Sequence, residues 1–170
     1  MTSLQTDIYK KEYIMALFNR MSSSYERVNY ITSFGFSLRW RRQFLDHTQC
    51  DSDKPEILDL LGGMGEIWPS VKQHYPNARI TCLDFSSKML QYAKKRNQKH
   101  FKNTVQLLNQ DALDNNLKSN SYDVVACAFG LKTFNQAQLG QLGEEVYRLL
   151  KPGGTFSFVE VSAPDNKILH

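Results

Sequence analysis

The chain has 170 residues, which suits one domain with one hydrophobic core. Its 41% hydrophobic and 22% charged residues exclude disordered and fibrous classes, and a net charge of +4 without a basic run gives no reason to expect nucleic acid as a partner. Three widely spaced cysteines without a CxxC or Cys/His cluster predict neither a metal site nor a disulfide framework. No stretch reaches ~18 apolar residues and the N-terminus carries no apolar run, so we expect no spanning segment, no secretory signal and a cytoplasmic protein.

The N-terminal third is expected to form helices. Residues 9–20 and 36–48 mix aromatic and charged residues at roughly helical spacing, whereas Met21–Phe34 indicates a loop or a broken helix. We expect residues 1–50 to act as a helical lid or cap on a core over residues 51–170, within one structural domain.

From residue 56 onward, predicted strands alternate with predicted helices. Apolar runs predict strands over residues 56–61, 79–83, 104–108, 121–129 and 155–161. Helices are predicted over residues 67–75, 86–99 and 139–150, with a tight turn at 151–154 before the last strand. This alternation predicts a doubly wound, mostly parallel α/β sheet of the Rossmann-like type. Such sheets bind ligands beyond the carboxyl ends of their strands, where the strand order reverses.

A glycine-rich turn follows the first predicted strand, within residues 57–65 (ILDLLGGMG). Glycine lets the backbone come close to a ligand because no Cβ intervenes. A generic strand-to-helix turn would also explain these glycines. The poor match to GxGxxG argues against a pyrophosphate-binding dinucleotide site.

Two acidic residues follow the second and third predicted strands. Asp84 lies about 20 residues beyond the glycines, where a carboxylate can accept hydrogen bonds from ribose hydroxyls, although it could also cap the next helix. A carboxylate at Asp111 could accept the amine of adenine while a backbone N–H at Ala112 serves a ring nitrogen, although Asp111 taken alone would be an ordinary loop residue. The glycine turn, Asp84 and Asp111 all lie at one edge of the predicted sheet, so we interpret them as one site.

The order and spacing of five segments resemble class I S-adenosylmethionine methyltransferases. The segments are ILDLLGGMG, ITCLDFSSKML, NQDAL, SYDVVACAFGLK and RLLKPGGTFSFVEVS. The sequence is most similar to the ubiquinone/menaquinone-biosynthesis C-methyltransferase family, whose DLxGGxG form matches 59–65 and whose SFGL motif matches 128–131. Its N-terminal pattern is similar to residues 18–41, so the resemblance covers about residues 15–164.

The resemblance implies S-adenosylmethionine as the cofactor and a set of contacts to it. These implied contacts are Asp59, Gly63, Met64, Gly65, Asp84, Phe85, Met89, Asp111, Ala112, Ala128, Phe129 and Tyr25. The glycines would admit the methionine end, and Ala128 and Phe129 would lie near the transferable methyl group. Tyr25 and its loop would close over the site as a lid.

The sequence departs from the family at three places. Leu61 stands where many methyltransferases carry glycine, and Met64 replaces a usual threonine. Lys132-Thr133 replaces the Arg-Asn pair that follows SFGL in the quinone enzymes. The last change bears on the quinone-ring substrate and on proton handling.

No catalytic residue is assigned. Transfer from a sulfonium needs the two reactants held in line, and an aromatic wall such as Phe129 or Tyr25 suits the cation. Carbon methylation also needs a base, for which His47, His100, Lys132 and Tyr25 qualify by type only. A histidine in such a position is more often structural, and no metal ion is expected to take part.

Three functions remain open from the sequence. The first is methylation at carbon or oxygen of a small hydrophobic, aromatic or polyketide-like molecule. The second is a cofactor-binding relative that catalyses another reaction, such as cyclisation, and the third is a non-catalytic interaction subunit.

The C-terminus suggests a shortened form. The resembling family continues after the fifth strand with a helix and two further strands, whereas this chain stops at His170. We therefore expect an exposed edge at residues 155–161 that drives self-association, unless residues 1–36 cover it.

Overall fold

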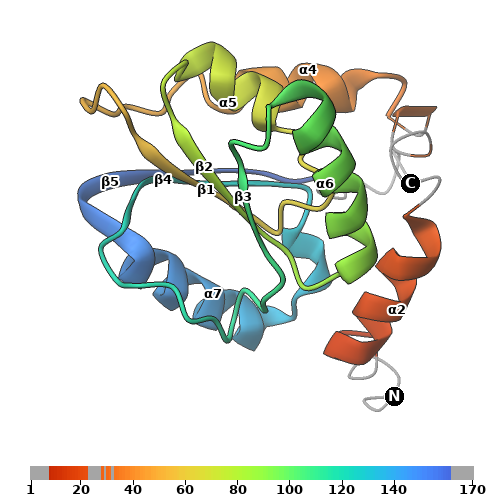
Figure 1. The fold of residues 1–170 in the computed structure, drawn as a ribbon. Coiled ribbons are helices and arrows are strands. Elements are labelled where there is room, and N and C mark those ends of the chain that lie inside the picture. Colours follow the sequence, from red (N-terminus) through yellow and green to blue (C-terminus); the bar gives the residue numbers. More distant parts are fainter. Residues whose placement is uncertain (1–7, 23–27, 29, 32, 162–170) are drawn as a thin grey trace, which may run out of the picture.

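The computed structural model describes residues 8–22, 28, 30–31 and 33–161 of the chain (Figure 1). Its elements in chain order are α2 (Lys11–Met21), α4 (Phe36–Gln43), β1 (Glu56–Leu60), α5 (Trp68–His74), β2 (Arg79–Leu83), α6 (Ser87–His100), β3 (Gln106–Leu108), β4 (Tyr122–Ala128), the short 3-10 turn η1 (Leu131–Thr133), α7 (Gln136–Leu149) and β5 (Leu150–Val159).

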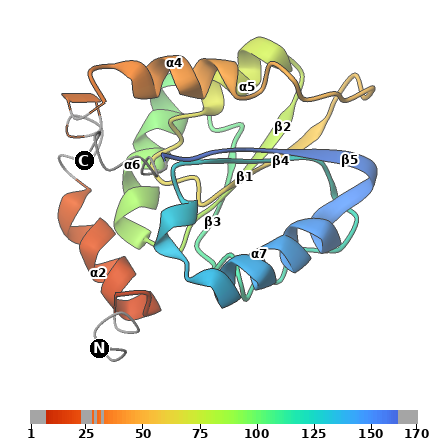
Figure 2. The same ribbon diagram turned by 180° about the vertical axis from the view of Figure 1, so that it is seen from behind.

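The strands form one parallel sheet in the order β3-β2-β1-β4-β5. β1 lies in the middle, where Ile57 pairs with Ile80 on one side and Val124 on the other. Helices α4, α5 and α6 lie on one face of the sheet and α7 on the other (Figures 1 and 2). This arrangement confirms the predicted doubly wound α/β fold.

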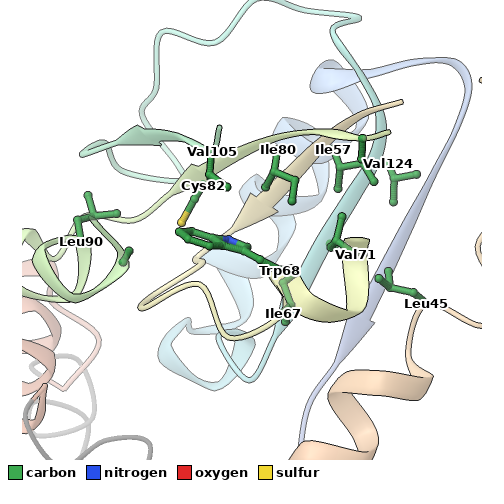
Figure 3. Packing of buried hydrophobic residues seen from close by; sticks show 13 residues of the cluster. Leu45, Ile57, Ile67, Trp68, Val71, Ile80, Cys82, Leu90, Val105 and Val124 are labelled. Carbon is green, nitrogen blue, oxygen red and sulfur yellow. The ribbon is translucent and has the colours of Figure 1, made fainter. Parts of the chain in front are cut away.

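Alternate residues of the central strands fill two separate cores. In β1, Ile57 packs beneath α5, whereas Leu58 packs toward α7. This division follows from the two-residue period of a strand covered on both faces. In the α5 core, the fully buried indole of Trp68 lies against Cys82 (Figure 3) and meets Phe101 edge-on at 5.3 Å between ring centroids.

The last strand begins earlier than its sequence predicts. Residues 151–154 were expected to form a turn before the strand, but β5 runs from Leu150 to Val159 and contains them. Its pairing with β4 shifts register between Tyr122 and Val124, so these residues form an irregularity inside the strand. Gly153 has φ 79°, and Lys151 binds Asp123 at 2.7 Å. The Pro-Gly-Gly segment therefore interrupts the regular pairing inside β5 instead of forming a turn before the strand.

Local signals fix the starts of the later helices. The Ser86 hydroxyl accepts the Met89 N–H at 3.2 Å and caps α6, as its sequence predicts. Asn135 and Gln138 form a reciprocal capping box at the start of α7. The predicted helix over 36–48 ends sooner, because α4 stops at Gln43 and turns follow.

The N-terminal helix α2 lies beside α6, beyond the carboxyl ends of the strands (Figures 1 and 2). The Ser86 hydroxyl donates to the Asn19 side chain at 2.7 Å and ties the two helices together. Leu45, just after α4, belongs to the same core as β1. The division into a cap over 1–50 and a core over 51–170 stays a prediction. None of the helices formed by the described residues is both long and apolar enough to cross a bilayer.

Candidate active site

The strand order reverses at β1, and the loops that follow β1, β2 and β4 meet at this edge of the sheet. Two of these loops begin with a bulky residue in the left-handed backbone region, Leu61 at φ 58° and Phe129 at φ 66°. Such residues are uncommon and tend to occur at functional sites. The predicted position of the site therefore coincides with local backbone strain.

A cavity opens among these loops, and the space free of protein atoms in and around its mouth amounts to about 540 Å³. Its walls come from the strand ends and from both N-terminal helices. They consist of Phe18, Arg41, Asp59, Leu61, Gly62, Gly63, Glu66, Ile67, Asp84, Phe85, Met89, Ala128, Phe129, Gly130 and Thr133. Seven of the predicted cofactor contacts thus share one cavity.

Asp84 is one of two buried aspartates that line this cavity, with only 6% of its surface exposed. One carboxylate oxygen accepts the Gly63 N–H at 2.9 Å and the other accepts the Ser86 N–H at 2.7 Å. Burial raises the pKa of Asp84 to about 6, against the opposite effect of these two backbone hydrogen bonds. The carboxylate joins the glycine turn to the start of α6.

Asp59 has a different environment, although it also borders the cavity. It is fully buried, and its Oδ2 accepts the Trp68 indole N–H at 2.8 Å. Burial raises its pKa to about 8, so the side chain is largely protonated at neutral pH. A Cβ on Gly62 would lie 2.5 Å from that oxygen, so the glycine is needed for this packing. Asp59 therefore links the strand to the turn.

Met64 and Gly65 are not among the described residues that form the cavity wall. Met64 is 5% exposed and borders a surface hollow between α5 and α6 instead. A Cβ on Gly65 would approach the Trp68 ring to 2.4 Å, and φ is 77° there. Close packing of the indole accounts for this glycine.

A second cavity adjoins the first and shares Leu61, Phe85 and Thr133 as walls. Asp111 lies in it, where Oδ1 accepts the Leu113 N–H at 3.0 Å and Oδ2 binds the Lys11 ammonium of α2 at 2.9 Å. Its neighbour Ala112 is buried in the α7 core with 1% exposure. The two cavities together connect the glycine turn with Asp111, as the sequence predicts.

Phe129 is covered by two side chains of α4. The Arg41 guanidinium lies 4.9 Å from the centre of its ring, and the Trp40 ring lies at 6.3 Å. Arg41 is only 7% exposed and reaches Glu66 at 3.8 Å. The Arg41 guanidinium thus already lies over one face of this ring, and the expected cation–π contact between Phe129 and a sulfonium stays a prediction.

Sequence reasoning gave Arg41 and Phe18 no role, although both line the first cavity. A signal existed for the arginine. Ser37, Arg41 and Leu45 follow one another at a spacing of four and are all buried, so the charged residue lies on the inward stripe of α4. A charge on such a stripe is seldom buried without a partner or a function.

None of the described candidates for a catalytic base lines either cavity. Lys132 is exposed, and its backbone N–H donates to the Glu160 carboxylate at 3.1 Å. His47 and His100 are exposed, the first in the turns after α4 and the second at the end of α6. Tyr25 lies outside the described residues. No group of three His, Cys, Asp or Glu suited to a metal ion occurs in the described part of the chain.

Residues 6–170 match the ubiE/COQ5 methyltransferase family. The chain belongs to this family. Demethylmenaquinone methyltransferases are among its relatives: that of Porphyromonas gingivalis is 29% identical over 172 residues, and that of Chlamydia trachomatis is 30% identical over 159 residues. These alignments cover 96% and 94% of this chain. The chain spans 66% of the length of each relative.

Solved structures of similar fold include methyltransferases and a cyclase. A methyltransferase described as S-adenosylmethionine-dependent, from Aquifex aeolicus, superposes with a TM-score of 0.62 at 18% identity, over 75% of this chain and 70% of that one. The [4+2]-cyclase SpnF gives 0.64 at 21%, over 72% and 44%. The fold is therefore that of class I methyltransferases, as predicted.

Proposed function

We propose that the complete protein transfers a methyl group from S-adenosylmethionine to a small hydrophobic or aromatic molecule. The observation that carries this proposal is the buried Asp84 carboxylate, which lies inside the first cavity at the end of β2 and accepts the Gly63 N–H. Membership in a methyltransferase family supports it.

The residues of the two cavities fit such a cofactor. Asp84 offers carboxylate oxygens to ribose hydroxyls, and Asp111 with the backbone of Ala112 offers partners to adenine. Phe85 and Met89 flank the adenosine, while Ala128 and Phe129 border the methyl-transfer end. A sulfonium supplies an electrophilic methyl carbon, to which the nucleophile bonds as the carbon–sulfur bond breaks and its electron pair stays on sulfur.

Arg41 adds a partner for the methionine end. Its guanidinium is buried at the cavity wall, and Glu66 lies 3.8 Å away. A carboxylate that enters beside Gly63 would find this guanidinium as a charge-assisted donor. We therefore assign Arg41 to the carboxylate of the cofactor.

The named relatives point to a quinone ring as the acceptor, since they are demethylmenaquinone methyltransferases. One observation favours a second function. The described candidate bases lie away from the cavities, and a cyclisation or another reaction without proton abstraction would not require one. A non-catalytic subunit that keeps the cofactor site is the third possibility.

Two measurements test the proposal. Calorimetry should show that S-adenosylhomocysteine binds and NAD does not; tighter NAD binding would overturn the cofactor assignment. Labelled methyl transfer to demethylmenaquinone and to a lipid extract then separates the functions. Cofactor binding without any transfer would favour cyclisation or a subunit role.

A further inference from the structure

An apolar surface without a described partner covers the start of α4 and the turn before it. Its members are Tyr30, Ile31, Phe34, Phe36, Leu38 and Trp40, which are 38–90% exposed and which we call the α4 patch. Phe34 is the most exposed of them at 90%. Phe36 and Trp40 stack at 5.8 Å between ring centroids.

The fold does not require an aromatic residue at the tip of this patch. Phe34 has φ 49°, a backbone conformation that glycine or asparagine adopts at lower cost. Backbone hydrogen bonds from the Phe34 N–H to Ile31 at 3.1 Å and from the Gly35 N–H to Tyr30 at 2.8 Å hold the turn. The structure thus presents a phenyl ring to solvent at a position that suits a polar residue.

All the charged residues of helix α4 are positive. α4 has the sequence FSLRWRRQ, with three arginines and no acid. Arg41 points inward, whereas Arg39 and Arg42 are exposed on the outer side, where Arg39 also donates to Gln43 at 3.2 Å. Projecting aromatic rings beside guanidinium groups match a bilayer interface with anionic headgroups, which needs no shape complementarity.

We propose that the α4 patch docks on the surface of an anionic lipid bilayer, with Phe34 and Phe36 in the interfacial layer and Arg39 and Arg42 at the phosphates. The same helix reaches the first cavity, because Trp40 lies 6.3 Å from Phe129. Trp40 thus connects the α4 patch with a residue of the cavity wall. The proposal does not depend on methyl transfer.

The test is co-sedimentation of the full-length protein with vesicles of phosphatidylcholine, with and without phosphatidylglycerol. We expect binding to the anionic vesicles only. Phe34→Asn, which suits the left-handed backbone, should weaken binding roughly tenfold or more. Arg39→Gln with Arg42→Gln should weaken it about 25-fold, from about fivefold per charge. Melting curves would confirm that the variants fold.

Matched controls lie elsewhere on the molecule. Tyr147→Ser removes an 84% exposed aromatic from α7, and Lys94→Gln with Lys99→Gln removes two charges from α6; both should leave binding unchanged. Brominated lipids should quench Trp40, since Trp68 is fully buried.

Three outcomes would overturn the proposal. In the first, the wild-type protein does not bind anionic vesicles. In the second, the α4-patch variants bind as well as the control variants. In the third, the protein binds but brominated lipids do not quench Trp40. A lipid-free dimer that Phe34→Asn dissociates would also overturn it, since the patch would then be an interface between two copies.

Discussion

Two buried carboxyl groups less than 30 residues apart have different roles at the residue scale. Asp84 faces a cavity and is held by backbone N–H groups, whereas Asp59 is bonded to an indole and is fully buried. Burial raises the pKa of both, to about 6 and about 8 respectively. This difference leads to separate predictions for ligand binding and for stability.

Asp84→Ala should weaken S-adenosylhomocysteine binding by about 1–3 kcal/mol, because charge-assisted hydrogen bonds to ribose are lost. In the wild-type protein, affinity should fall as pH drops through about 6, since protonation removes the accepting carboxylate. Calorimetry between pH 5 and 8 would measure both effects. Asp46→Asn, an exposed carboxyl outside the cavities, serves as the control. Unchanged affinity in a folded Asp84 variant would refute the ribose role.

Asp59→Asn should remove a pH dependence of stability. The folded pKa of Asp59 is about 8 and its unfolded value is 3.8, so the folded state retains a proton that the unfolded state releases. Its contribution to the free energy of unfolding is full below pH 4 and is lost as pH rises to about 8. Asparagine keeps an acceptor for Trp68 without the charge. Urea unfolding should show the variant gaining on the wild type as pH rises, and parallel curves would contradict this.

At the element scale, packing and helix propensity act on different residues of helix α7. Its buried face is formed by Leu142, Val146 and Leu149, as the apolar spacing predicts. Gly140 and Gly143 lie on the exposed side, and a Cβ on either would meet no atom within 4 Å. Neither glycine serves a contact in the described structure.

Gly140→Ala and Gly143→Ala should each raise the free energy of unfolding by about 0.5–1 kcal/mol, because alanine costs less backbone entropy in a helix. Thermal melting would measure the gain, and the two changes should add. Gly65→Ala is the contrasting variant, since its Cβ would collide with Trp68 at 2.4 Å. Destabilisation by the α7 changes would show that these glycines have a role the structure does not reveal.

The sequence could predict those parts of the site that follow from the order of strands and loops along the chain, but not the contacts between distant segments. The placement of Asp84 and Asp111 in adjoining cavities could be predicted, because parallel strands end at one edge and position along the chain then fixes position in space. The spacing of Arg41 with Ser37 and Leu45 could have indicated its burial, but its contact with Phe129 depends on packing between segments almost 90 residues apart. The start of β5 was misplaced for a related reason: Pro-Gly-Gly suits a turn and an irregularity inside a strand alike, and pairing with β4 decides between them.

At the scale of the whole molecule, the outer edges of β3 and β5 pair with no described strand, and β5 is the longer of these two edge strands. β5 ends the sheet order, and Phe156 on it is 62% exposed. Side chains of Thr155 and Ser157 bond to the segment after α4, which covers one face of the strand and leaves the outer edge unpaired. Unpaired strand edges recruit other strands.

We therefore propose that this 170-residue chain self-associates through β5. Sedimentation velocity should show concentration-dependent oligomers, and Phe156→Lys should reduce them, because an edge lysine opposes strand pairing. Tyr147→Lys on α7 adds the same charge at another exposed aromatic and should leave the oligomers in place. A monomer at all concentrations would contradict the proposal.

The central place of β1 also affects how the chain is made. β1 precedes every other strand along the chain. The Glu56 N–H at its start nevertheless donates to the side chain of Asp123 in β4, which is synthesised 67 residues later. At about 5–20 residues per second on the ribosome, that interval lasts about 3–13 s. During this interval β1, which is apolar, can pair with β2 on one side but has no partner on the other. Until β4 emerges, growing chains of this fold therefore expose an unpaired side of β1 to one another, whatever the stability of the finished protein.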